Sequence, residues 1–323
     1  MNKNIKIFTN YCLGPILFVV LTWSLYKQIV HQEDILTRWN QIKSSWQHPI
    51  FLLVILLMFL NWGFETVKWQ ILMKPLQHFS FKEAYKAILA GCSITMLTPN
   101  RIGEYGGRIL FVKNENKVKA ISVTILGSIA QLAITFLLGT IGIIYFKHSH
   151  HFESSNSIFQ LITSNLILWV SVFISILLVL FYFNIQIFKR VIISLPFLKK
   201  LPNTIFYTLS YDKKVLLRVL LLSAFRYLIF ILQYVLMLRL MNVYIDFLPC
   251  VFLVSLFFMF MALAPTIGLI ELPVRATAGW LLFGMMSNNF LGIQATVFCI
   301  WLINLVIPSL IGSVSMLRLK IFT

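Results

Sequence analysis

The sequence predicts an all-α, polytopic membrane protein. Of its 323 residues, 59% are hydrophobic and only 11% are charged, whereas a soluble globular domain has about 45 to 50% apolar and about 25% charged residues. The surplus of apolar side chains has to face lipid. The net charge is +17, but the basic residues lie between apolar stretches and form no basic stripe interleaved with aromatic residues, which argues against a nucleic-acid partner.

Six stretches each supply the roughly 20 mainly apolar residues that a bilayer-spanning helix needs. They are residues 11–30, 49–70, 120–146, 159–183, 215–240 and 291–317. The first stretch follows Lys3 and Lys6, as a signal peptide would, but no small-residue cleavage site comes after it. We therefore expect an uncleaved first helix.

Two further apolar segments, residues 83–112 and 247–286, contain helix-breaking residues. These are Pro99, Gly103, Gly106 and Gly107 in the first segment, and Pro265, Gly268 and Pro273 in the second. A broken backbone is tolerated at membrane depth only against protein or a water-filled cavity. The arm 83–97 reaches only about 22 Å, less than the hydrocarbon core of about 30 Å. We expect two re-entrant or short helical hairpins and look for function there first.

The distribution of basic residues predicts the orientation of the chain. With the amino terminus in the cytoplasm, 18 Lys and Arg residues lie on the inner side and 5 on the outer side, as the positive-inside rule requires. Both termini are then cytoplasmic, and the two hairpins enter from opposite faces. The basic segment 184–214 is expected to lie on anionic lipid of the inner leaflet.

The chain has the same predicted order, helix, helix, hairpin and helix, in each half, residues 1–146 and 159–323 of a single membrane domain. The run L-T-P-N-R-I-G-E at 97–104 is similar to L-A-P-T-I-G-L-I-E at 263–271. In both hairpins an Arg follows the Glu by four residues, Glu104 with Arg108 and Glu271 with Arg275, a spacing that makes the pair face each other on a helix. This pattern predicts an inverted-topology repeat, typical of secondary transporters.

Seven ionisable residues are predicted at membrane depth: Glu65, Arg101, Glu104, Arg108, Arg226, Glu271 and Arg275. Placing a charge at the bilayer centre costs at least about 2.5 kcal/mol of free energy. Such residues are therefore paired with an opposite charge, hydrated, or required for function. In a purely structural interpretation, ion pairs lock each hairpin, Glu65 is interfacial near Lys68, and Arg226 bonds a carbonyl. For the set as a whole we favour a hydrated polar cavity that binds a substrate.

Catalytic and metal-binding motifs are not found in the sequence. It contains no H-E-x-x-H, P-loop or G-x-S-x-G motif. The cluster of His148, His150 and His151 is interpreted as a solvated outer loop. The four cysteines are interpreted as small buried thiols: Cys12, Cys92, Cys250 and Cys299. We predict no catalytic residue, no metal and no cofactor.

The run T-P-N-R-I-G-E-Y-G-G-R at 98–108 resembles the membrane domain of the lysylphosphatidylglycerol synthase family, also called the flippase-like domain family. The second hairpin, with Pro265, Gly268 and Glu271, is similar to a late motif of that family, and the resemblance covers nearly the whole chain. It implies a protein of a bacterial-type inner membrane that moves phospholipids between leaflets or acts on lipid-linked intermediates. Bifunctional members add an aminoacyl-transferase domain after the last helix; this chain ends six residues past Leu317, so we expect no such domain or activity.

The leading hypothesis is a lipid flippase that moves a phospholipid or lipid-linked head group through a polar cavity between the hairpins. The four arginines at membrane depth would hold phosphate, while Glu104 and Glu271 would orient them or meet an aminoacyl ammonium. Two alternatives remain open. One is a membrane enzyme that uses Glu104 or Glu271 as acid or base on a lipid-linked substrate, and the other is a non-transporting scaffold.

Overall fold

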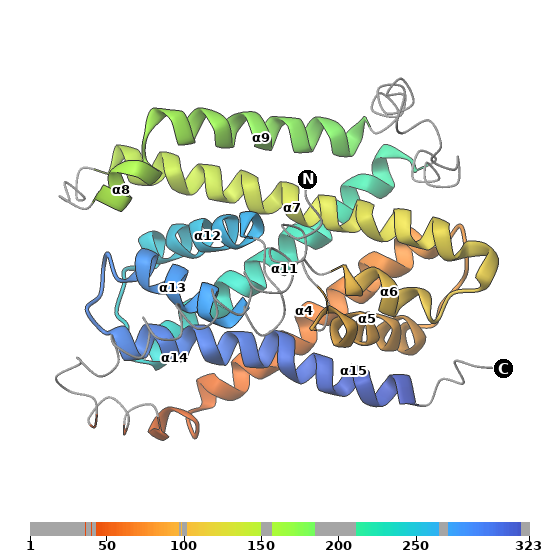
Figure 1. Cartoon of the computed structure of the whole chain (residues 1–323), viewed down its shortest axis with the longest axis horizontal. Helices are drawn as coiled ribbons and strands as arrows, with labels where there is room; N and C mark the ends of the chain where they lie inside the picture. Colours follow the sequence, from red (N-terminus) through yellow and green to blue (C-terminus); the bar gives the residue numbers. More distant parts are fainter. Residues whose placement is uncertain are drawn as a thin grey trace, which may run out of the picture.

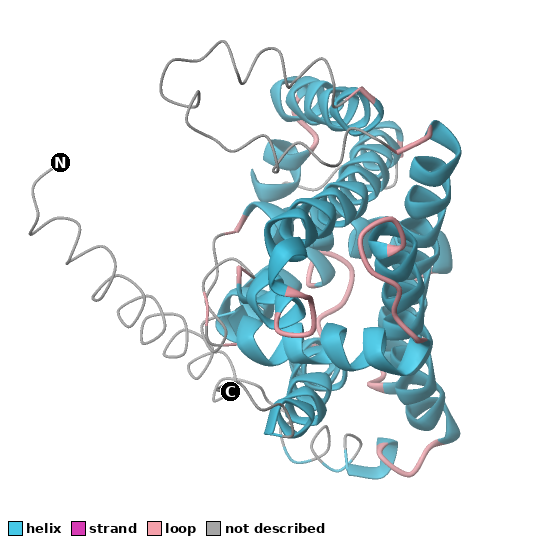
Figure 2. Ribbon diagram, turned by 90° about the vertical axis from the view of Figure 1, so that its right-hand side faces the viewer, coloured by secondary structure: helices cyan, strands magenta, loops and turns pink. Residues whose placement is uncertain are grey.

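The computed structural model describes residues 43–96, 98, 102–149, 157–184, 211–264 and 271–317, together with Leu36 and Asn40. This part of the chain consists of helices and loops (Figures 1 and 2). Five of its helices are long and apolar enough to cross a membrane. The predicted all-α polytopic fold is confirmed, and the protein is an integral membrane protein. Several predicted features lie outside the described residues, among them the helix 11–30, most of the basic segment 184–214, Pro99, Arg101, Pro265 and Gly268.

The two spanning helices of the first half match the predicted stretches 49–70 and 120–146. Helix α4 (Pro49–Met73) begins with a proline, whose missing N–H is not needed in a first turn, and the His48 side chain accepts a hydrogen bond from the backbone N–H of Ile50. Helix α7 (Lys117–His148) follows a short 3-10 turn, Asn114–Asn116. Basic side chains in its last turn suit the negative end of the helix dipole.

The spanning segments of the second half also match, with one subdivision. The predicted helix 159–183 is split into α8 (Ser157–Ile162) and α9 (Asn165–Phe183). The split occurs because the Ser164 hydroxyl caps α9, accepting a hydrogen bond from the backbone N–H of Ile167. Helix α11 (Lys213–Leu240) is continuous. The last span consists of α14 (Phe290–Trp301), a π-helical turn (Leu302–Val306) and α15 (Ile307–Leu317).

The first hairpin is formed by α5 (Phe81–Thr95) and α6 (Gly103–Ile109). A capping box begins α5: the Ser80 hydroxyl accepts from the Glu83 N–H, and the Glu83 carboxylate accepts from the Ser80 N–H. Hydrogen bonds from the Ser80 backbone and side chain lower the pKa of the exposed Glu83 carboxyl. At 15 residues, α5 is about 22 Å long and too short to cross the membrane.

Gly106 and Gly107 do not break α6, which corrects the sequence prediction, and Gly107 serves packing. Gly106 and Gly107 lie inside the helix, Gly103 is its first residue, and the interruption falls before Gly103. A Cβ atom on Gly107 would lie 2.5 Å from the carbonyl oxygen of Ala90 and from backbone atoms of Gly91. Glycine at this position therefore lets α6 pack directly on the backbone of α5.

The second hairpin is formed by α12 (Phe247–Leu263) and α13 (Glu271–Phe283). Pro273 was predicted to break this segment, but it is the third residue of α13, within the first turn, where a missing N–H leaves no helical hydrogen bond unmade. Figure 1 shows the two hairpins on opposite sides of the molecule, between the α7–α9 layer and the α14–α15 layer.

Close contacts between helices rely on small residues. Helix α4 packs along α11, α5 along α15, and α7 along both α9 and α12. A Cβ atom on Gly139 of α7 would lie 2.8 Å from Met259 Cβ of α12, and the Ser309 hydroxyl of α15 donates to the Cys92 carbonyl of α5 at 3.0 Å. In lipid, the burial of apolar surface contributes little to the association of helices. Close packing and interhelical hydrogen bonds of this kind hold the helices together instead.

Candidate functional site

One face of α4 carries three buried polar residues in the middle of an otherwise apolar helix. Asn61, Glu65 and Lys68 follow the spacing i, i+4 and i+7, so their side chains lie on one side of the helix. Their exposed fractions are 0%, 3% and 2%. Glu65 lies about 24 Å along the helix from Pro49 and about 12 Å from Met73, well inside the span. Polar groups at this depth need partners.

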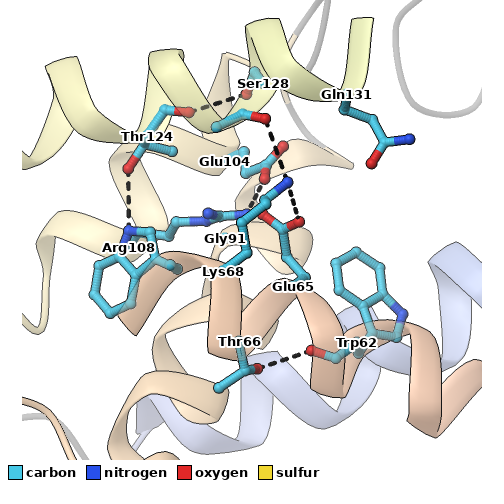
Figure 3. A network of polar contacts seen from close by, with 12 residues as sticks. Trp62, Glu65, Thr66, Lys68, Gly91, Glu104, Arg108, Thr124, Ser128 and Gln131 are labelled. Atoms are coloured by element: carbon cyan, nitrogen blue, oxygen red, sulfur yellow. Dashed lines mark hydrogen bonds and ion pairs between the residues drawn. The ribbon is translucent and has the colours of Figure 1, made fainter. Parts of the chain in front are cut away.

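The Glu65 carboxylate meets three cations from three helices. Its Oε1 accepts from Arg108 Nη2 of α6 at 2.8 Å, and its Oε2 pairs with Arg226 Nη1 of α11 and with Lys68 Nζ at 2.6 Å. Figure 3 shows Glu65 with Lys68 beside it and Arg108 reaching across from the hairpin. We call these residues, together with Glu104, the Glu65 network.

Arg108 reaches the network because of the glycine packing in the first hairpin. Its side chain passes Gly91 of α5, where a Cβ atom would lie 3.3 Å from Arg108 Cγ. The guanidinium also pairs with Glu104 one turn earlier on α6. The sequence predicted this i, i+4 pair, and the structure confirms it. Arg108 is therefore held between a partly exposed carboxylate on its own helix and the buried Glu65 on α4.

Arg226 is fixed by polar and aromatic neighbours. Its Nε donates to Asn61 Oδ1 at 2.8 Å, and its guanidinium lies 5.6 Å from the ring centroid of Trp62 and 5.9 Å from that of Phe230. Such cation–π contacts stabilise a desolvated guanidinium. Gln131 of α7 contributes a longer contact, 3.5 Å from Arg226 Nη1. The orientation of Arg226 is thus set by three helices.

Helix α7 closes the network on the remaining side. Lys68 Nζ donates to the Gly127 carbonyl at 3.3 Å, and Trp69 Nε1 of α4 donates to the Thr124 hydroxyl at 3.1 Å. A Cβ atom on Gly127 would lie 3.2 Å from Leu72 Cδ1 and 3.5 Å from Lys68 Cε, so this glycine packs directly against the Lys68 side chain. The five charged residues of the network carry two negative and three positive charges, which leaves a net charge of +1 inside the protein.

In the second hairpin, Glu271 and Arg275 form the predicted i, i+4 pair. Arg275 Nε and Nη2 both contact Glu271 Oε1, at 2.7 and 2.5 Å, and both side chains are at least nine-tenths buried. Of the six predicted charged site residues that the structure describes, four therefore lie in the Glu65 network and two pair with each other.

Sequence reasoning missed several members of this site. Lys68 was counted among the basic residues of the inner side, whereas the structure buries it within α4 in contact with Glu65. Glu65, which is interfacial in the purely structural interpretation, is buried as well. Asn61, Trp62 and Gln131 were not singled out at all. The i, i+4, i+7 spacing of Asn61, Glu65 and Lys68 was the signal that would have found the polar face.

The described residues contain no group of three His, Cys, Asp or Glu side chains that would hold a metal ion. Cys92, Cys250 and Cys299 are buried thiols that form no disulfide within the described part of the chain, as predicted for small buried thiols. Cys12 and the residues of the predicted His cluster at 150 and 151 lie outside the described residues.

The fold and the site define an integral membrane protein whose helices enclose a network of charged side chains at membrane depth. The chain belongs to the family described as the lysylphosphatidylglycerol synthase TM region, whose sequence model matches residues 11–312. This match confirms the resemblance inferred from the motif at 98–108. No curated protein matches the chain significantly.

Proposed function

We propose that this protein is a lipid flippase, which moves a phospholipid or a lipid-linked head group between the two leaflets. The observation that carries the proposal is the Glu65 network. Three cations and two carboxylates, from α4, α6 and α11, meet deep between helices that are long enough to span a membrane. Burying so many charges is energetically costly. A role in passing a charged head group across the membrane explains why the protein keeps them in its interior.

The packing of the helices supports an inverted repeat, with halves near residues 1–146 and 159–323. The second helices of the two halves, α4 and α11, pack against each other. Each hairpin packs on the last helix of the other half: α5 on α15, and α12 on α7. This reciprocal exchange is what a two-fold axis between the halves produces.

Residue contacts at the α4–α11 crossing support the same axis. Phe64 stacks on Phe225 with ring centroids 6.0 Å apart, and Glu65 pairs with Arg226. Both contacts join positions 161 residues apart in the sequence, and the two hairpin glutamates, Glu104 and Glu271, are 167 apart. Contacts between equivalent positions occur where a two-fold axis passes. Rocking of two such halves about a site at their interface is how many transporters alternate access.

The distribution of basic residues supports a location in a bacterial-type inner membrane with both termini in the cytoplasm. With Lys68 moved into the protein interior, the bias becomes 17 inner to 5 outer residues, so the positive-inside rule still favours this orientation. Basic residues of the segment 184–214 would bind anionic lipid of the inner leaflet.

In this proposal the arginines receive the phosphate of the head group. Arg108 and Arg226 are held by Glu65, and a phosphate that approaches would compete with that carboxylate for the guanidinium donors. Arg275 and Glu271 would do the same in the second hairpin, and Arg101 is included from its place in the first motif. Glu104 and Glu271 keep the arginines oriented when no lipid is bound.

A leaflet-accessibility assay in proteoliposomes tests the proposal. Lipid carrying a fluorescent label is reconstituted with the protein, and the label in the outer leaflet is reduced chemically. The parent protein should make the protected fraction accessible, whereas Glu104→Ala and Arg275→Ala should slow this exchange. Lys86→Ala, which removes an exposed charge from α5, is the matched control. Exchange at the parent rate in both site variants would refute the site, and no exchange by the parent in any lipid mixture would refute the function.

A further inference from the structure

One face of α7 carries four polar side chains, and one of them lacks a hydrogen bond of normal length. Thr124, Ser128, Gln131 and Thr135 follow the spacing i, i+4, i+7 and i+11, which places them on one side of the helix. The three hydroxyls donate to backbone carbonyls one turn earlier, at 2.7, 3.2 and 3.0 Å. Within the described part of the chain, the Gln131 amide has only a contact of 3.5 Å with Arg226 Nη1. Its carbonyl oxygen can therefore accept from a donor that comes closer.

Arg226 is the cation that Glu65 can release at the lowest cost. When it leaves, Glu65 keeps two other cations, Arg108 on Oε1 and Lys68 on Oε2, so the carboxylate is not left buried without a partner. Arg108 is also held by a second carboxylate, Glu104. Among the described residues, the other hydrogen-bond acceptors around Arg226 are neutral amides. The charge of Arg226 is thus the one most readily transferred to another anion.

A small movement takes the Arg226 guanidinium from Glu65 to Gln131. Its Nη1 pairs with Glu65 Oε2 and lies 3.5 Å from Gln131 Oε1, so one nitrogen faces both oxygens. A normal hydrogen bond to Gln131 needs an approach of only about 0.5 Å. The bond from Nε to Asn61 Oδ1, at 2.8 Å, provides a pivot for this movement. Arg226 therefore has a second acceptor, on α7, within reach of its bonded position.

The guanidinium also fixes the orientation of the Gln131 amide. Oε1 faces Arg226 Nη1, because Nε2 in that place would set one donor against another. The Gln131 side chain is half-buried, whereas Glu65 and Lys68 are 3% and 2% exposed. Figure 3 shows it extending from α7 at the Trp62 end of the network. Gln131 therefore lies at the accessible margin of the Glu65 network.

Unpartnered donors beside Arg226 are suited to an acceptor from outside the chain. Within the described residues, Asn61 Nδ2 and Trp62 Nε1 have no hydrogen-bond partner, and both residues are more than nine-tenths buried. Both lie against the guanidinium, because Asn61 Oδ1 accepts from Arg226 Nε and the Trp62 ring centroid is 5.6 Å from Arg226 Cζ. Buried donors without an acceptor are costly. An anion that binds at Arg226 would meet them.

We propose that Gln131 is a positioning residue of the flippase site, which holds Arg226 once that arginine has left Glu65 for a lipid phosphate. Gln131 Oε1 then accepts from Arg226 Nη1, and the remaining N–H groups of the guanidinium donate to phosphate oxygens. The return of Arg226 to Glu65 releases the phosphate. Arg226 thus has two positions, one in the lipid-free protein and one with lipid bound. The inference rests on the flippase function proposed above and names a residue that governs the affinity of its site.

Moving a carboxylate tests the second position of Arg226 without any lipid transport. Glu65→Gln leaves the cations of the network short of a partner, and Gln131→Glu in the same protein offers a carboxylate at the second position. This double variant should recover part of the unfolding temperature that Glu65→Gln loses. Glu65→Gln with Gln131→Asp is the matched control, since it has the same charge on a side chain one methylene shorter, and it should recover less. No recovery, or equal recovery in both double variants, would overturn the proposal.

Removing the acceptor separates positioning from ordinary packing. A contact of 3.5 Å contributes little to the lipid-free protein, so Gln131→Leu should unfold at the temperature of the parent. In the leaflet-accessibility assay, it should need an about tenfold higher lipid fraction for half-maximal exchange, the effect of losing a hydrogen bond to a charged group, with an unchanged maximal rate. Fluorescent phosphatidylglycerol and phosphatidylethanolamine serve as probes, and both should be affected alike because both carry the phosphate.

Thr135→Val is the control for the exchange assay. It lies one turn further along the same face, and its hydroxyl donates to the backbone carbonyl of Gln131, so the variant should exchange lipid like the parent. Lower stability of Gln131→Leu with an unchanged half-maximal lipid fraction would indicate a packing role and overturn the proposal. Parent-like exchange in Gln131→Leu, with exchange lost in Arg275→Ala, would refute the role of Gln131 alone. No exchange by the parent would refute the flippase function, and the carboxylate variants would still decide whether Arg226 reaches Gln131.

Discussion

Replacing Glu65 by glutamine removes the charge that holds three cations together. Glutamine has the same shape, so the substitution leaves Lys68, Arg108 and Arg226 buried with Glu104 as the remaining carboxylate of the network. Removing one partner of a buried ion pair costs about 3 to 5 kcal/mol. Because Glu65 has three such partners, we expect Glu65→Gln to lower the free energy of unfolding by at least about 3 kcal/mol. Denaturant titration of the purified protein in lipid–detergent micelles measures this difference.

Two comparisons make the result specific. Glu104 contacts Arg108 and its side chain is 22% exposed, so solvent screening limits the effect of Glu104→Gln to about 1 kcal/mol. The double variant Glu65→Gln with Arg226→Gln removes one uncompensated cation and should be more stable than Glu65→Gln alone. The reasoning fails if Glu65→Gln costs no more than Glu104→Gln, because the network would then contribute nothing as a buried unit.

The remaining predictions concern packing, charge and capping, each measured by unfolding of the purified variants. Gly107→Ala should lower the free energy of unfolding by about 1 to 3 kcal/mol, because the added Cβ has no room against α5. Gly106→Ala should be neutral or stabilising, because an added Cβ there would have nothing within 4 Å. Equal effects of the two substitutions would contradict the packing argument. Lys68→Met removes one positive charge from a network of net +1 and should cost less than about 1 kcal/mol; a loss as large as that of the carboxylate variant would contradict this. Ser80→Ala removes the cap of α5 and should cost about 1 kcal/mol, and an unchanged stability would show that the capping box is dispensable.

Local features of the site followed from the sequence because short-range spacing determines them. Glu104 with Arg108, and Glu271 with Arg275, are four residues apart on one helix, so the helical repeat alone brings them together. The spanning helices were equally predictable, since roughly 20 apolar residues in a row have few alternatives. Their observed ends differ from the predicted ones by a few residues, where capping groups such as Ser164 act.

The centre of the site did not follow from the sequence, because its contacts are long-range. Glu65 and Arg226 are 161 residues apart, and no local pattern indicates that α4 and α11 cross at these positions. Lys68 was misassigned for a related reason: near the end of an apolar stretch, a buried lysine and an interfacial lysine have the same sequence context. Only the Glu65 carboxylate and the Gly127 carbonyl, which meet the ammonium in the folded protein, distinguish the two cases.

In the inverted repeat proposed above, the axis between the halves would pass the contact between Glu65 and Arg226, so the two halves would not be symmetric in charge there. Equivalent positions meet there, so apolar residues can match, as Phe64 and Phe225 do, but two ionised residues must have opposite signs. It matters which helix carries the negative charge, because Glu65 of α4 also binds Arg108 of the first hairpin.

A charge exchange tests which of these contacts matters. Glu65→Arg with Arg226→Glu keeps the pair between α4 and α11 and keeps the net charge of the network, but it sets an arginine against Lys68 and Arg108. If the pair between the helices were sufficient, the exchanged protein would unfold like the parent. We expect it instead to lose at least about 3 kcal/mol, as when a buried charge is left without its partner, because the negative charge is needed on α4, where the first hairpin docks.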